Sequence, residues 1–550
     1  MAALVATAET GICARQPVRS RHAMVATREA HSTDIGLAVL ESGGNAIDAA
    51  VAVGFALAVT HPAAGNIGGG GFLLARFRDG RTTFIDFRER APEAASRNMY
   101  IGPDGKATSD SVVGYRASGV PGTVRGLEFA HEKYGRKRWA DLVEPAVRLA
   151  SNGFPVSYGL ARSLRNAAER LAAFPESKRI FLNDGRFCQA GERLVQPELA
   201  RTLERIRDRG AKDFYEGETA RLLAADMQAH GGLITLGDLK NYRVIERTPL
   251  TGSYRGYTIV TAPPPSSGGV GILQMLGVLE GSGYEKSGFG SADELHFLAE
   301  TMRRYFADRS EYMGDPDFYH VPVAALLNPR YIRELRRSID PEHATPSTTL
   351  HPGKLDTIET SDTTHYSIVD AEGNAVAVTY TLNNSFGSAV TATKLGFLLN
   401  DEMDDFAAKP GEPNLFGLIQ GEANAIQPRK TPLSSMTPTI VLRDGKLYLV
   451  LGSPGGPTII NTVLEVLVNV IDFGMNIADA VDAPRLHHQW MPDVLRMERG
   501  FSPDTIALLK ARGHTVEIED HQGEVAAIRL QDECLEGDAD PRTDGTARGY

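Results

Sequence analysis

The stretch 361–385 reads Ser-Asp-Thr-Thr-His-Tyr-Ser-Ile-Val-Asp-Ala-Glu-Gly-Asn-Ala-Val-Ala-Val-Thr-Tyr-Thr-Leu-Asn-Asn-Ser. Two runs rich in β-branched and aromatic residues flank residues 370–374, whose Gly and Asn favour a turn. This pattern predicts a β-hairpin, and closing the turn directly places Thr363 opposite Thr381 at its open end. Threonine pairs in strands usually only pack, so the spacing alone leaves a purely structural role open.

The residues before the hairpin, 341–362, are polar, rich in Pro and Thr, and almost without apolar periodicity. This composition is typical of a flexible linker, and a linker that runs straight into a strand is what a processing site would look like. Cleavage between Asp362 and Thr363 would give Thr363 a free α-amine beside its own hydroxyl. Because an α-amine has a pKa of about 8, one residue would then supply both nucleophile and general base near neutral pH.

With Thr-Thr-His-Tyr-Ser at 363–367, the chain resembles the γ-glutamyltransferases, N-terminal-nucleophile (Ntn) hydrolases that cleave themselves before the first Thr of this motif. The resemblance covers nearly the whole chain and rests on several separated motifs. It implies an α+β fold, the four-layer αββα sandwich of the Ntn hydrolases. It also implies a large subunit, 1–362, and a small subunit, 363–550, intertwined in one domain. We expect residues 1–20 to be flexible.

Hairpins interleaved with long amphipathic segments agree with sandwiched sheets covered by helices. Two further hairpins are predicted at 72–87 and 437–452, each with an Asp-Gly turn, and a single strand at 254–260. The predicted helices have apolar residues at helical spacing or are apolar all round. They cover 32–43, 45–60, 123–133, 139–152, 196–208, 216–230, 293–305 and 457–473.

Composition and charge exclude several classes of function. With 42% apolar and 23% charged residues, the 550-residue chain is ordinary for a soluble globular enzyme, and no run of about 18 apolar residues predicts a membrane helix. The three scattered cysteines give neither a disulfide framework nor a metal pattern. From Thr363 onward, 14 basic and 26 acidic residues give a net charge of −12, which argues against nucleic acid.

The amino-terminal residues lack the basic and apolar regions of a secretory signal. The sequence as written therefore predicts a cytoplasmic protein. If the native start differs, a periplasmic or secreted protein is expected, as for many bacterial members of the resembled family.

Arg88 follows a predicted strand within Asp-Phe-Arg-Glu, where a lone arginine is usually a surface charge. The resemblance assigns it to the substrate's α-carboxylate, which a planar guanidinium binds through two parallel hydrogen bonds. Ser434 and Ser435 are implied as its partners. In the acidic stretch 398–406 the spacing fits no EF-hand; the resemblance instead implies that Glu402 and Asp405 bind the α-ammonium.

The predicted register of the 437–452 hairpin brings Ser434 opposite Gly455 and Ser435 opposite Pro454. Pro457 would begin a helix, so Gly455 and Gly456 would present backbone N–H groups at a helix N-terminus, a good place to stabilise an oxyanion. In the resembled family this glycine pair is the oxyanion hole. Ser453 lies outside a Gly-x-Ser-x-Gly elbow, so a conventional serine nucleophile is not expected.

Three other features have competing interpretations. The glycine cluster at 65–71 lacks the spacing of a phosphate loop and is better explained by close backbone packing. Adjacent His487 and His488 point apart, so we interpret them as structural rather than as metal ligands. The long loop 411–431 resembles the family's lid over the donor pocket, with Phe416 where bacterial relatives often carry a tyrosine whose hydroxyl could bond Asn383.

The resemblance implies that Thr363 attacks the γ-carbonyl of glutathione or another γ-glutamyl donor, with Thr381 and Asn383 positioning its hydroxyl and amine. The γ-glutamyl group then passes to an amino acid, a peptide or water, with no metal or organic cofactor and no membrane or nucleic-acid partner. Two alternatives remain: a related Ntn acylase for glutaryl-type amides, or an uncleaved amino-acid-binding protein. Asp362, where relatives carry Gln or Glu, is a departure from the pattern at the cleavage site.

Overall fold

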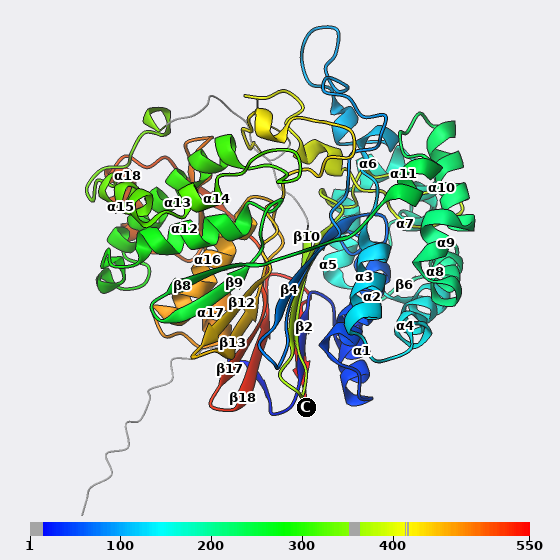
Figure 1. Ribbon diagram of the computed structural model, residues 1–550, viewed down its shortest axis with the longest axis horizontal. Coiled ribbons are helices and arrows are strands. Elements are labelled where there is room, and N and C mark those ends of the chain that lie inside the picture. Colours follow the sequence, from blue (N-terminus) through cyan, green and yellow to red (C-terminus); the bar gives the residue numbers. More distant parts are fainter. Residues whose placement is uncertain (1–14, 351–362, 413, 415–416) are drawn as a thin grey trace, which may run out of the picture.

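The computed structural model describes residues 15–350, 363–412, 414 and 417–550. Two stacked β-sheets lie between two layers of helices, which is the predicted four-layer αββα sandwich (Figure 1). Each sheet has seven strands in the described part of the chain, and every strand pair in both is antiparallel.

The first sheet has its strands in the spatial order β1 (Val18–Ser20), β18 (Cys534–Ala539), β17 (Ala526–Gln531), β13 (Lys446–Leu451), β12 (Thr439–Arg443), β9 (Tyr257–Thr261) and β8 (Leu250–Tyr254). The order in the second sheet is β19 (Thr546–Gly549), β2 (Met24–Thr27), β10 (Thr363–Val369), β11 (Ala375–Thr381), β3 (Gly70–Arg76), β4 (Thr82–Asp86) and β7 (Ile245–Arg247). Both sheets therefore combine strands from before Thr363 with strands from after it.

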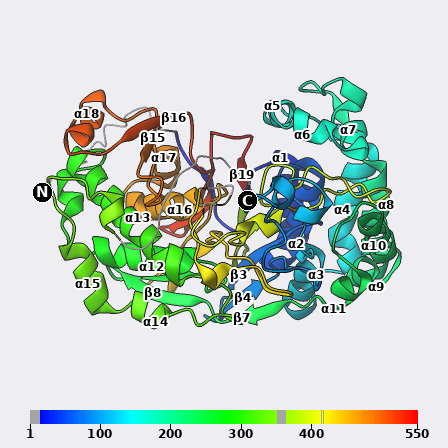
Figure 2. The ribbon, with the colours of Figure 1, turned by 90° about the horizontal axis from the view of Figure 1, so that it is seen from above.

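The helical layers cover the outer faces of the two sheets, and both views separate them clearly (Figures 1 and 2). The helices on the side of the second sheet are α1 (Ala30–Glu41), α2 (Ala46–Thr60), α3 (Thr123–Tyr134), α4 (Trp139–Asn152), α5 (Tyr158–Asn166), α6 (Ala168–Ala172), α7 (Pro175–Phe181), α8 (Pro197–Arg209), α9 (Ala211–Glu216), α10 (Glu218–Ala229) and α11 (Leu236–Asn241). Those on the side of the first sheet are α12 (Gly268–Leu279), α13 (Ala292–Tyr312), α14 (Val323–Leu326), α15 (Pro329–Arg337), α16 (Thr458–Ile471), α17 (Ile477–Asp482) and α18 (Pro503–Ala511).

Strands β10 and β11 lie in the middle of the second sheet and are buried along their whole length. Alternate side chains face the helical layer, where Tyr366 donates a hydrogen bond to Ala50 O (2.9 Å) and Tyr380 to Gly54 O (3.0 Å) in α2. The intervening side chains face the other sheet; among them, His365 is kept neutral because burial lowers its pKa to about 3. A strand covered on both faces has little freedom to slip, which fixes the position of its ends.

The turn between these strands is tied to the start of α2. Asp370 accepts hydrogen bonds from the backbone N–H groups of Glu372 (3.0 Å) and Asn374 (2.9 Å), and its other oxygen accepts one from Ala46 N (2.9 Å). Helix α2 itself begins with a capping box between Asn45 and Asp48, and it is buried all round, as the sequence predicts. The hairpin and its covering helix are thus anchored to each other at one end.

Three predicted elements differ from the structure. The strand expected at 254–260 is a tight hairpin, β8–β9, because Arg255 and Gly256 adopt positive φ angles (47° and 85°) that reverse the chain. The helix expected at 216–230 is interrupted at Gly217, which separates α9 from α10. The β12–β13 hairpin turns as predicted, but a register irregularity between Val441 and Leu442 shifts the remaining pairs by one residue.

Part of the predicted linker is bound by charged side chains. Glu300 accepts hydrogen bonds from Thr345 N (3.0 Å) and Thr345 Oγ1 (2.6 Å). Arg303 donates to Ser347 Oγ (2.6 Å), and Asp493 accepts from Ser347 N (2.7 Å). These charged side chains form what we call the anchor cluster: Glu300, Arg303, Arg304 and Asp493.

Residues 345–347 are therefore fixed to α13, although they fall inside the predicted linker 341–362. Residues 351–362 lie outside the described part of the chain. Near the amino terminus, Val18–Ser20 form β1, which pairs with β18. None of the described helices combines the length and the apolar content that crossing a bilayer requires.

Candidate functional site

The hairpin register predicted from the sequence is confirmed: Thr363 pairs with Thr381 at the open end of β10 and β11. Their hydroxyl oxygens lie 3.3 Å apart, and both residues are almost fully buried. Thr381 Oγ1 accepts a hydrogen bond from Asn383 N (2.8 Å), and Thr381 O accepts one from Asn66 Nδ2 (2.8 Å). Because Thr381 is held from two sides, it can fix the position of the Thr363 hydroxyl.

The two threonines open into a narrow cleft of about 20 Å³, well below the usual range for ligand pockets. The cleft brings together nine of the site residues expected from the sequence: Arg88, Thr363, Thr381, Asn383, Glu402, Asp405, Ser434, Ser435 and Gly456. Leu418, Met436, Pro457 and Ile459 complete its lining. Gly455, the residue before Gly456, does not line the cleft. Asp362 lies outside the described residues.

Arg88 is the central cation of the cleft and is 1% exposed. It extends from the end of β4 and forms ion pairs with Glu402 and Asp405, both in the short helical turn η6 (Glu402–Asp405). Glu89 lies 3.7 Å from Arg88 Nη1. Neither carboxylate oxygen of Glu89 accepts a hydrogen bond from the described residues, and the same holds for Glu402 Oε2.

The charges around Arg88 do not balance, since three buried carboxylates face one guanidinium. Burial raises the pKa of Glu89, Glu402 and Asp405, while Arg88 opposes this effect. For Arg88, burial disfavours the charge, but the pKa is held above its ordinary value by Glu402 and Asp405. Such a site favours a ligand that brings a cationic group to the carboxylates and an anionic group to the guanidinium.

Ser434 and Ser435 form the part of the cleft lining that we call the serine wall, held by the loop 263–267 that precedes α12. Ser434 O accepts hydrogen bonds from both the N–H and the hydroxyl of Ser267 (2.8 Å each), and Ser434 N donates to Pro265 O (3.0 Å). The predicted strand pairing of Ser434 with Gly455 is wrong, because β12 begins only at Thr439 and Ser434 bridges to Ser266 instead. The predicted convergence on one cleft nevertheless holds for Ser434, Ser435 and Gly456.

Gly455 and Gly456 precede α16 and adopt positive φ angles of 127° and 54°. A Cβ atom at Gly455 would lie 2.3 Å from Thr458 Oγ1, so both conformation and space require glycine there. Within the described residues, the backbone N–H groups of both glycines donate to no protein acceptor. A helix N-terminus with free N–H groups beside a nucleophile can stabilise an oxyanion.

The loop expected as a lid is fixed near its end by amide side chains. Asn424 Nδ2 donates to Asp405 O (2.6 Å), and its Oδ1 accepts from Leu433 N (3.0 Å). Gln420 Nε2 also donates to Asp405 O (3.1 Å). These bonds connect the acidic turn to the serine wall; Phe416, the aromatic residue of the expected lid, lies outside the described residues.

The glycine cluster at 65–71 provides close packing, as interpreted from the sequence. A Cβ at Gly69 would lie 2.1 Å from Thr381 O, and one at Gly68 would lie 2.2 Å from Leu398 O. His487 and His488 make protein contacts instead of sharing a ligand: His487 bonds Asn461 (2.7 Å), and His488 lies 3.3 Å from Asp493. Burial lowers the pKa of both histidines, to about 3 and about 4.

Sequence reasoning missed three residues of this site. Glu89 could have been found as the neighbour of Arg88, and Asn66 as the one polar side chain within the glycine cluster. Arg309 could not, because it lies on the long helix α13, where an arginine ordinarily indicates a solvated face. In the structure Arg309 is 2% exposed and donates to Ser435 Oγ (3.2 Å).

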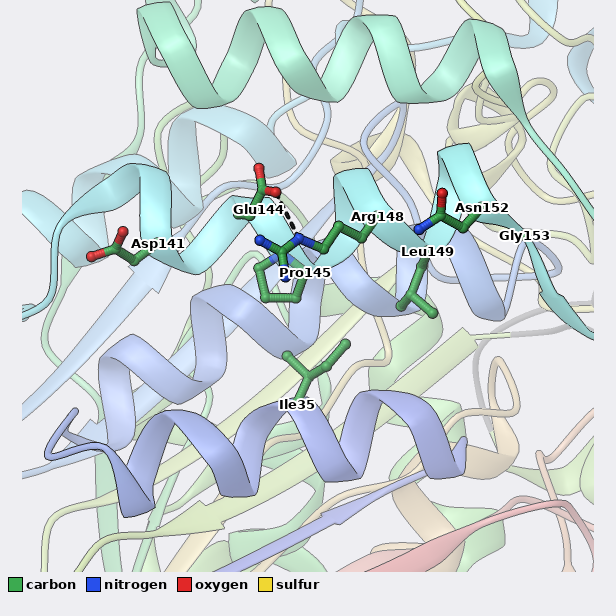
Figure 3. Close-up of a pocket in the computed structure, with 8 residues that line it drawn as sticks. All are labelled: Ile35, Asp141, Glu144, Pro145, Arg148, Leu149, Asn152 and Gly153. Carbon is green, nitrogen blue, oxygen red and sulfur yellow. Dashed lines mark hydrogen bonds and ion pairs between the residues drawn. The ribbon is translucent and has the colours of Figure 1, made fainter.

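A wider depression of about 580 Å³ lies elsewhere, between α1 and α4 (Figure 3). Its charged side chains are already paired: Glu144 accepts hydrogen bonds from Arg148 (2.8 Å) and Arg207 (2.7 Å), and Asp141 from Arg138 (2.7 Å). None of its lining residues carries a buried polar atom without a partner. The smaller cleft at Thr363 is therefore the better candidate for a functional site.

The chain is similar to known proteins over nearly its whole length. The family model described as gamma-glutamyltranspeptidase matches residues 32–550. The glutathione hydrolase proenzyme of Escherichia coli (strain K12) is 51% identical over 538 residues, which cover 97% of this chain and 93% of that protein.

Two solved structures are also similar. The cephalosporin acylase from Bacillus halodurans has a TM-score of 0.88 at 26% identity and covers 100% of this chain and 99% of its own. The gamma-glutamyltranspeptidase of Helicobacter pylori has a TM-score of 0.58 at 45% identity and covers 62% of this chain and 97% of its own.

Proposed function

Because this chain belongs to the gamma-glutamyltranspeptidase family, we propose that it is an autoprocessing γ-glutamyltransferase acting on glutathione and related γ-glutamyl compounds. It transfers the γ-glutamyl group to amino acids, peptides or water. One observation carries the proposal. The Thr363 hydroxyl, 3.3 Å from that of Thr381, opens into the same cleft as a buried set of charges that suits an amino acid head group.

The first step is cleavage of the chain before Thr363. Thr363 Oγ attacks the carbonyl carbon of Asp362, and the C–N bond breaks as the nitrogen takes up the proton. Water then hydrolyses the resulting ester, which leaves a carboxylate on Asp362 and a free α-amine on Thr363. The products are chains 1–362 and 363–550. This step creates the base that the second reaction needs.

In the second reaction Thr363 Oγ attacks the γ-carbonyl carbon of the donor, and the α-amine of Thr363 takes the hydroxyl proton. Thr381 and Asn383 hold the nucleophile in position. The N–H groups of Gly455 and Gly456 face the developing oxyanion, a contribution of roughly 3–4 kcal/mol per donor in acyl-transfer enzymes. The leaving amine takes the proton, and an acceptor amine or water then attacks the γ-glutamyl ester.

The donor's head group binds by an exchange of ionic partners. Arg88 is paired with Glu402 and Asp405 in the structure. When the donor enters, Arg88, Ser434 and Ser435 bind its α-carboxylate, and the two acids turn to its α-ammonium. The ammonium supplies the positive charge that the three carboxylates lack, so the amino group is recognised together with the carboxylate.

The similarity to a cephalosporin acylase favours one second candidate, an acylase for glutaryl-type amides. A glutaryl group has the α-carboxylate position but no ammonium, and it would leave Glu402 and Asp405 without a cation. The γ-glutamyl assignment therefore fits this cleft better. Hydrolysis of glutaryl anilide faster than that of γ-glutamyl anilide would favour the acylase instead.

The test begins with intact-protein mass spectrometry of the freshly purified chain under denaturing conditions. Two species that divide between Asp362 and Thr363 are expected. The variant Thr363→Ala should remain one chain, and its turnover of γ-glutamyl anilide should fall by at least about 10⁴-fold, because the nucleophile is gone.

Thr363→Ser is the matched control, since it retains a hydroxyl and should still cleave itself. A wild-type protein that stays uncut but binds glutamate would support an amino-acid-binding protein. Turnover that survives in Thr363→Ala would contradict the mechanism.

A further inference from the structure

Arg309 is a buried cation next to the cleft that the mechanism above does not use. It lies near the end of α13, where its Nε donates to Ser267 Oγ (2.9 Å) and one terminal nitrogen, Nη2, donates to Ser435 Oγ (3.2 Å). The other terminal nitrogen, Nη1, is buried without a hydrogen-bond acceptor among the described residues. Burial lowers the pKa of Arg309, and the charge of Asp405 opposes that effect.

The bond from Arg309 determines what Ser435 can do. A hydroxyl carries one hydrogen and two lone pairs, and an arginine can only donate. With a lone pair of Ser435 Oγ occupied by Arg309, the hydroxyl hydrogen is directed away from α13. Ser435 lines the cleft, so it is left as a hydrogen donor toward an anionic group of a ligand.

The backbone around Ser435 is held by the same loop that holds Arg309. Ser267 accepts from Arg309 through its hydroxyl, and its carbonyl oxygen accepts from Tyr305 Oη (2.5 Å), also on α13. The N–H and hydroxyl of Ser267 both bind Ser434 O. Helix α13 thus positions the serine wall through one buried guanidinium and one loop.

We propose that Arg309 is a positioning residue of the α-carboxylate subsite: it orients the Ser435 hydroxyl as a donor to the carboxylate and adds a second buried positive charge behind it. This inference rests on the proposed function, because it concerns the donor's α-carboxylate. It predicts a defect that is confined to donors carrying that group. A residue that only stabilised the fold would affect all donors alike.

Three anilide donors separate these possibilities. γ-Glutamyl anilide carries both head groups, 4-aminobutyryl anilide lacks only the α-carboxylate, and glutaryl anilide lacks only the α-ammonium. The variants are Arg309→Met, which removes the charge and the donors, and Arg309→Lys, which retains the charge. Arg304→Lys on the same helix is the matched control, because Arg304 is equally buried but bonds Glu300 and Ser338 away from the cleft.

For γ-glutamyl anilide, Arg309→Met should raise KM about 10- to 100-fold with kcat changed less than about threefold, since a hydrogen bond to a charged group is lost. Arg309→Lys should recover part of this loss. The KM for glutaryl anilide should rise similarly in Arg309→Met, whereas kcat/KM for 4-aminobutyryl anilide should stay within about twofold of the wild-type value. Arg304→Lys should leave the ratios between the three donors unchanged.

The double variant Arg309→Met/Ser435→Ala tests whether Arg309 acts through Ser435. Its loss of kcat/KM should be smaller than the product of the two single losses, because residues in one hydrogen-bonded unit are not additive. Any loss beyond that of Ser435→Ala alone comes from the missing charge of Arg309. Multiplicative effects of the two changes, or equal losses for all three donors, would overturn the inference. If Arg309→Met fails to fold, Arg309→Lys is measured instead. Ratios of kcat/KM between the three donors that equal those of the wild type would then overturn the inference.

The outcomes separate this inference from the proposed function. A wild-type chain that neither cleaves itself nor hydrolyses γ-glutamyl anilide would overturn both. A wild-type chain that does both, with an Arg309→Met variant at the wild-type KM, would overturn the role of Arg309 alone.

Discussion

Helix α13 carries side chains of two buried ionic clusters that differ in how completely their members are paired. In the anchor cluster, both oxygens of Glu300 accept two hydrogen bonds each, from Arg303, Arg304 and Thr345. The second, which we call the donor cluster, consists of Arg88, Glu89, Glu402, Asp405 and Arg309. There Glu89, Glu402 and Arg309 each keep at least one buried polar atom without a partner in the described structure.

The buried carboxyl groups of the two clusters also have pKa values shifted in opposite directions. Burial raises the pKa of Glu300, but Arg303 and Arg304 outweigh it, and the pKa is lowered overall. For Glu402, burial also raises the pKa, and the single nearby Arg88 does not reverse it. A buried charge that is fully paired is structural, whereas one that is left under-paired next to a cleft marks a place for a charged ligand.

The largest effect should follow from breaking the donor cluster at its centre. Arg88→Met removes the cation that we propose binds the donor's α-carboxylate, and it leaves three carboxylates together. We expect kcat/KM for γ-glutamyl anilide to fall about 10³- to 10⁴-fold, because two charge-assisted hydrogen bonds are lost. Steady-state kinetics with the three anilides provides the measurement.

For the same variant, we expect a smaller loss of kcat/KM with 4-aminobutyryl anilide, which has no carboxylate for Arg88 to bind. Arg247→Met is a suitable control, since Arg247 pairs with Asp86 (2.8 Å) just before Arg88 but does not line the cleft. Equal losses with all donors would mean that Arg88 maintains the site rather than binding the carboxylate.

Breaking the anchor cluster should instead reduce stability. Glu300→Gln leaves Arg303 and Arg304 without their buried counter-charge, and we expect the free energy of unfolding to fall by about 3 kcal/mol. Denaturant unfolding should be measured in the Thr363→Ala background, where the protein remains a single chain. In the cleaved enzyme the same change should leave the KM for γ-glutamyl anilide within about twofold. A raised KM at unchanged stability would contradict the division between the two clusters.

Glu294, near the start of α13, sharpens the comparison because it is a buried carboxyl with no cation beside it. Burial raises its pKa to about 8, although Gly290 N donates to it (3.0 Å). The folded state therefore favours the protonated acid. The contribution of protonated Glu294 to the stability of the folded state is complete below the ordinary pKa of 4.5, and it is lost as the pH rises through 8.

Glu294→Gln, which cannot ionise, should remove this dependence. The Tm of the variant minus that of the wild type should be small near pH 5 and increase by about 2–4 °C by pH 8.5. Thermal melts across this range test the expectation, and titrations elsewhere in the protein cancel in the difference. Parallel Tm curves would show that Glu294 does not titrate there.

The sequence predicted the β10–β11 register because the short turn at 370–374 leaves few ways to pair the two β-rich runs that flank it. The same reasoning failed for β12–β13, since nothing in the residues around Val441 and Leu442 marks the irregularity. Likewise, Tyr254-Arg-Gly-Tyr257 lacks the Asn-Gly or Asp-Gly signal of a tight hairpin, so β8 and β9 merged into one predicted strand.

Some residues of the candidate site could also be predicted from the sequence, and others could not. Arg88, Glu402, Asp405 and the two serines could be assigned because each lies in a short motif of the resembled family. Arg309 could not, because its role depends on a contact between α13 and a loop more than a hundred residues away, at Ser435. Helical periodicity reports which face of α13 is buried and does not indicate which buried charge faces a cleft.

Because both sheets contain strands from before and after Thr363, cleavage has a consequence for how the protein could be refolded. After cleavage, β10 of one fragment would still pair with β2 of the other, and β11 with β3, so breaking one peptide bond would leave the sandwich intact. Folding of the precursor is a first-order process within one chain. Reassembly of two separated fragments would be second order, with both partners exposing unpaired strand edges. The mature enzyme would thus owe its persistence to slow unfolding, and its refolding yield would depend on concentration.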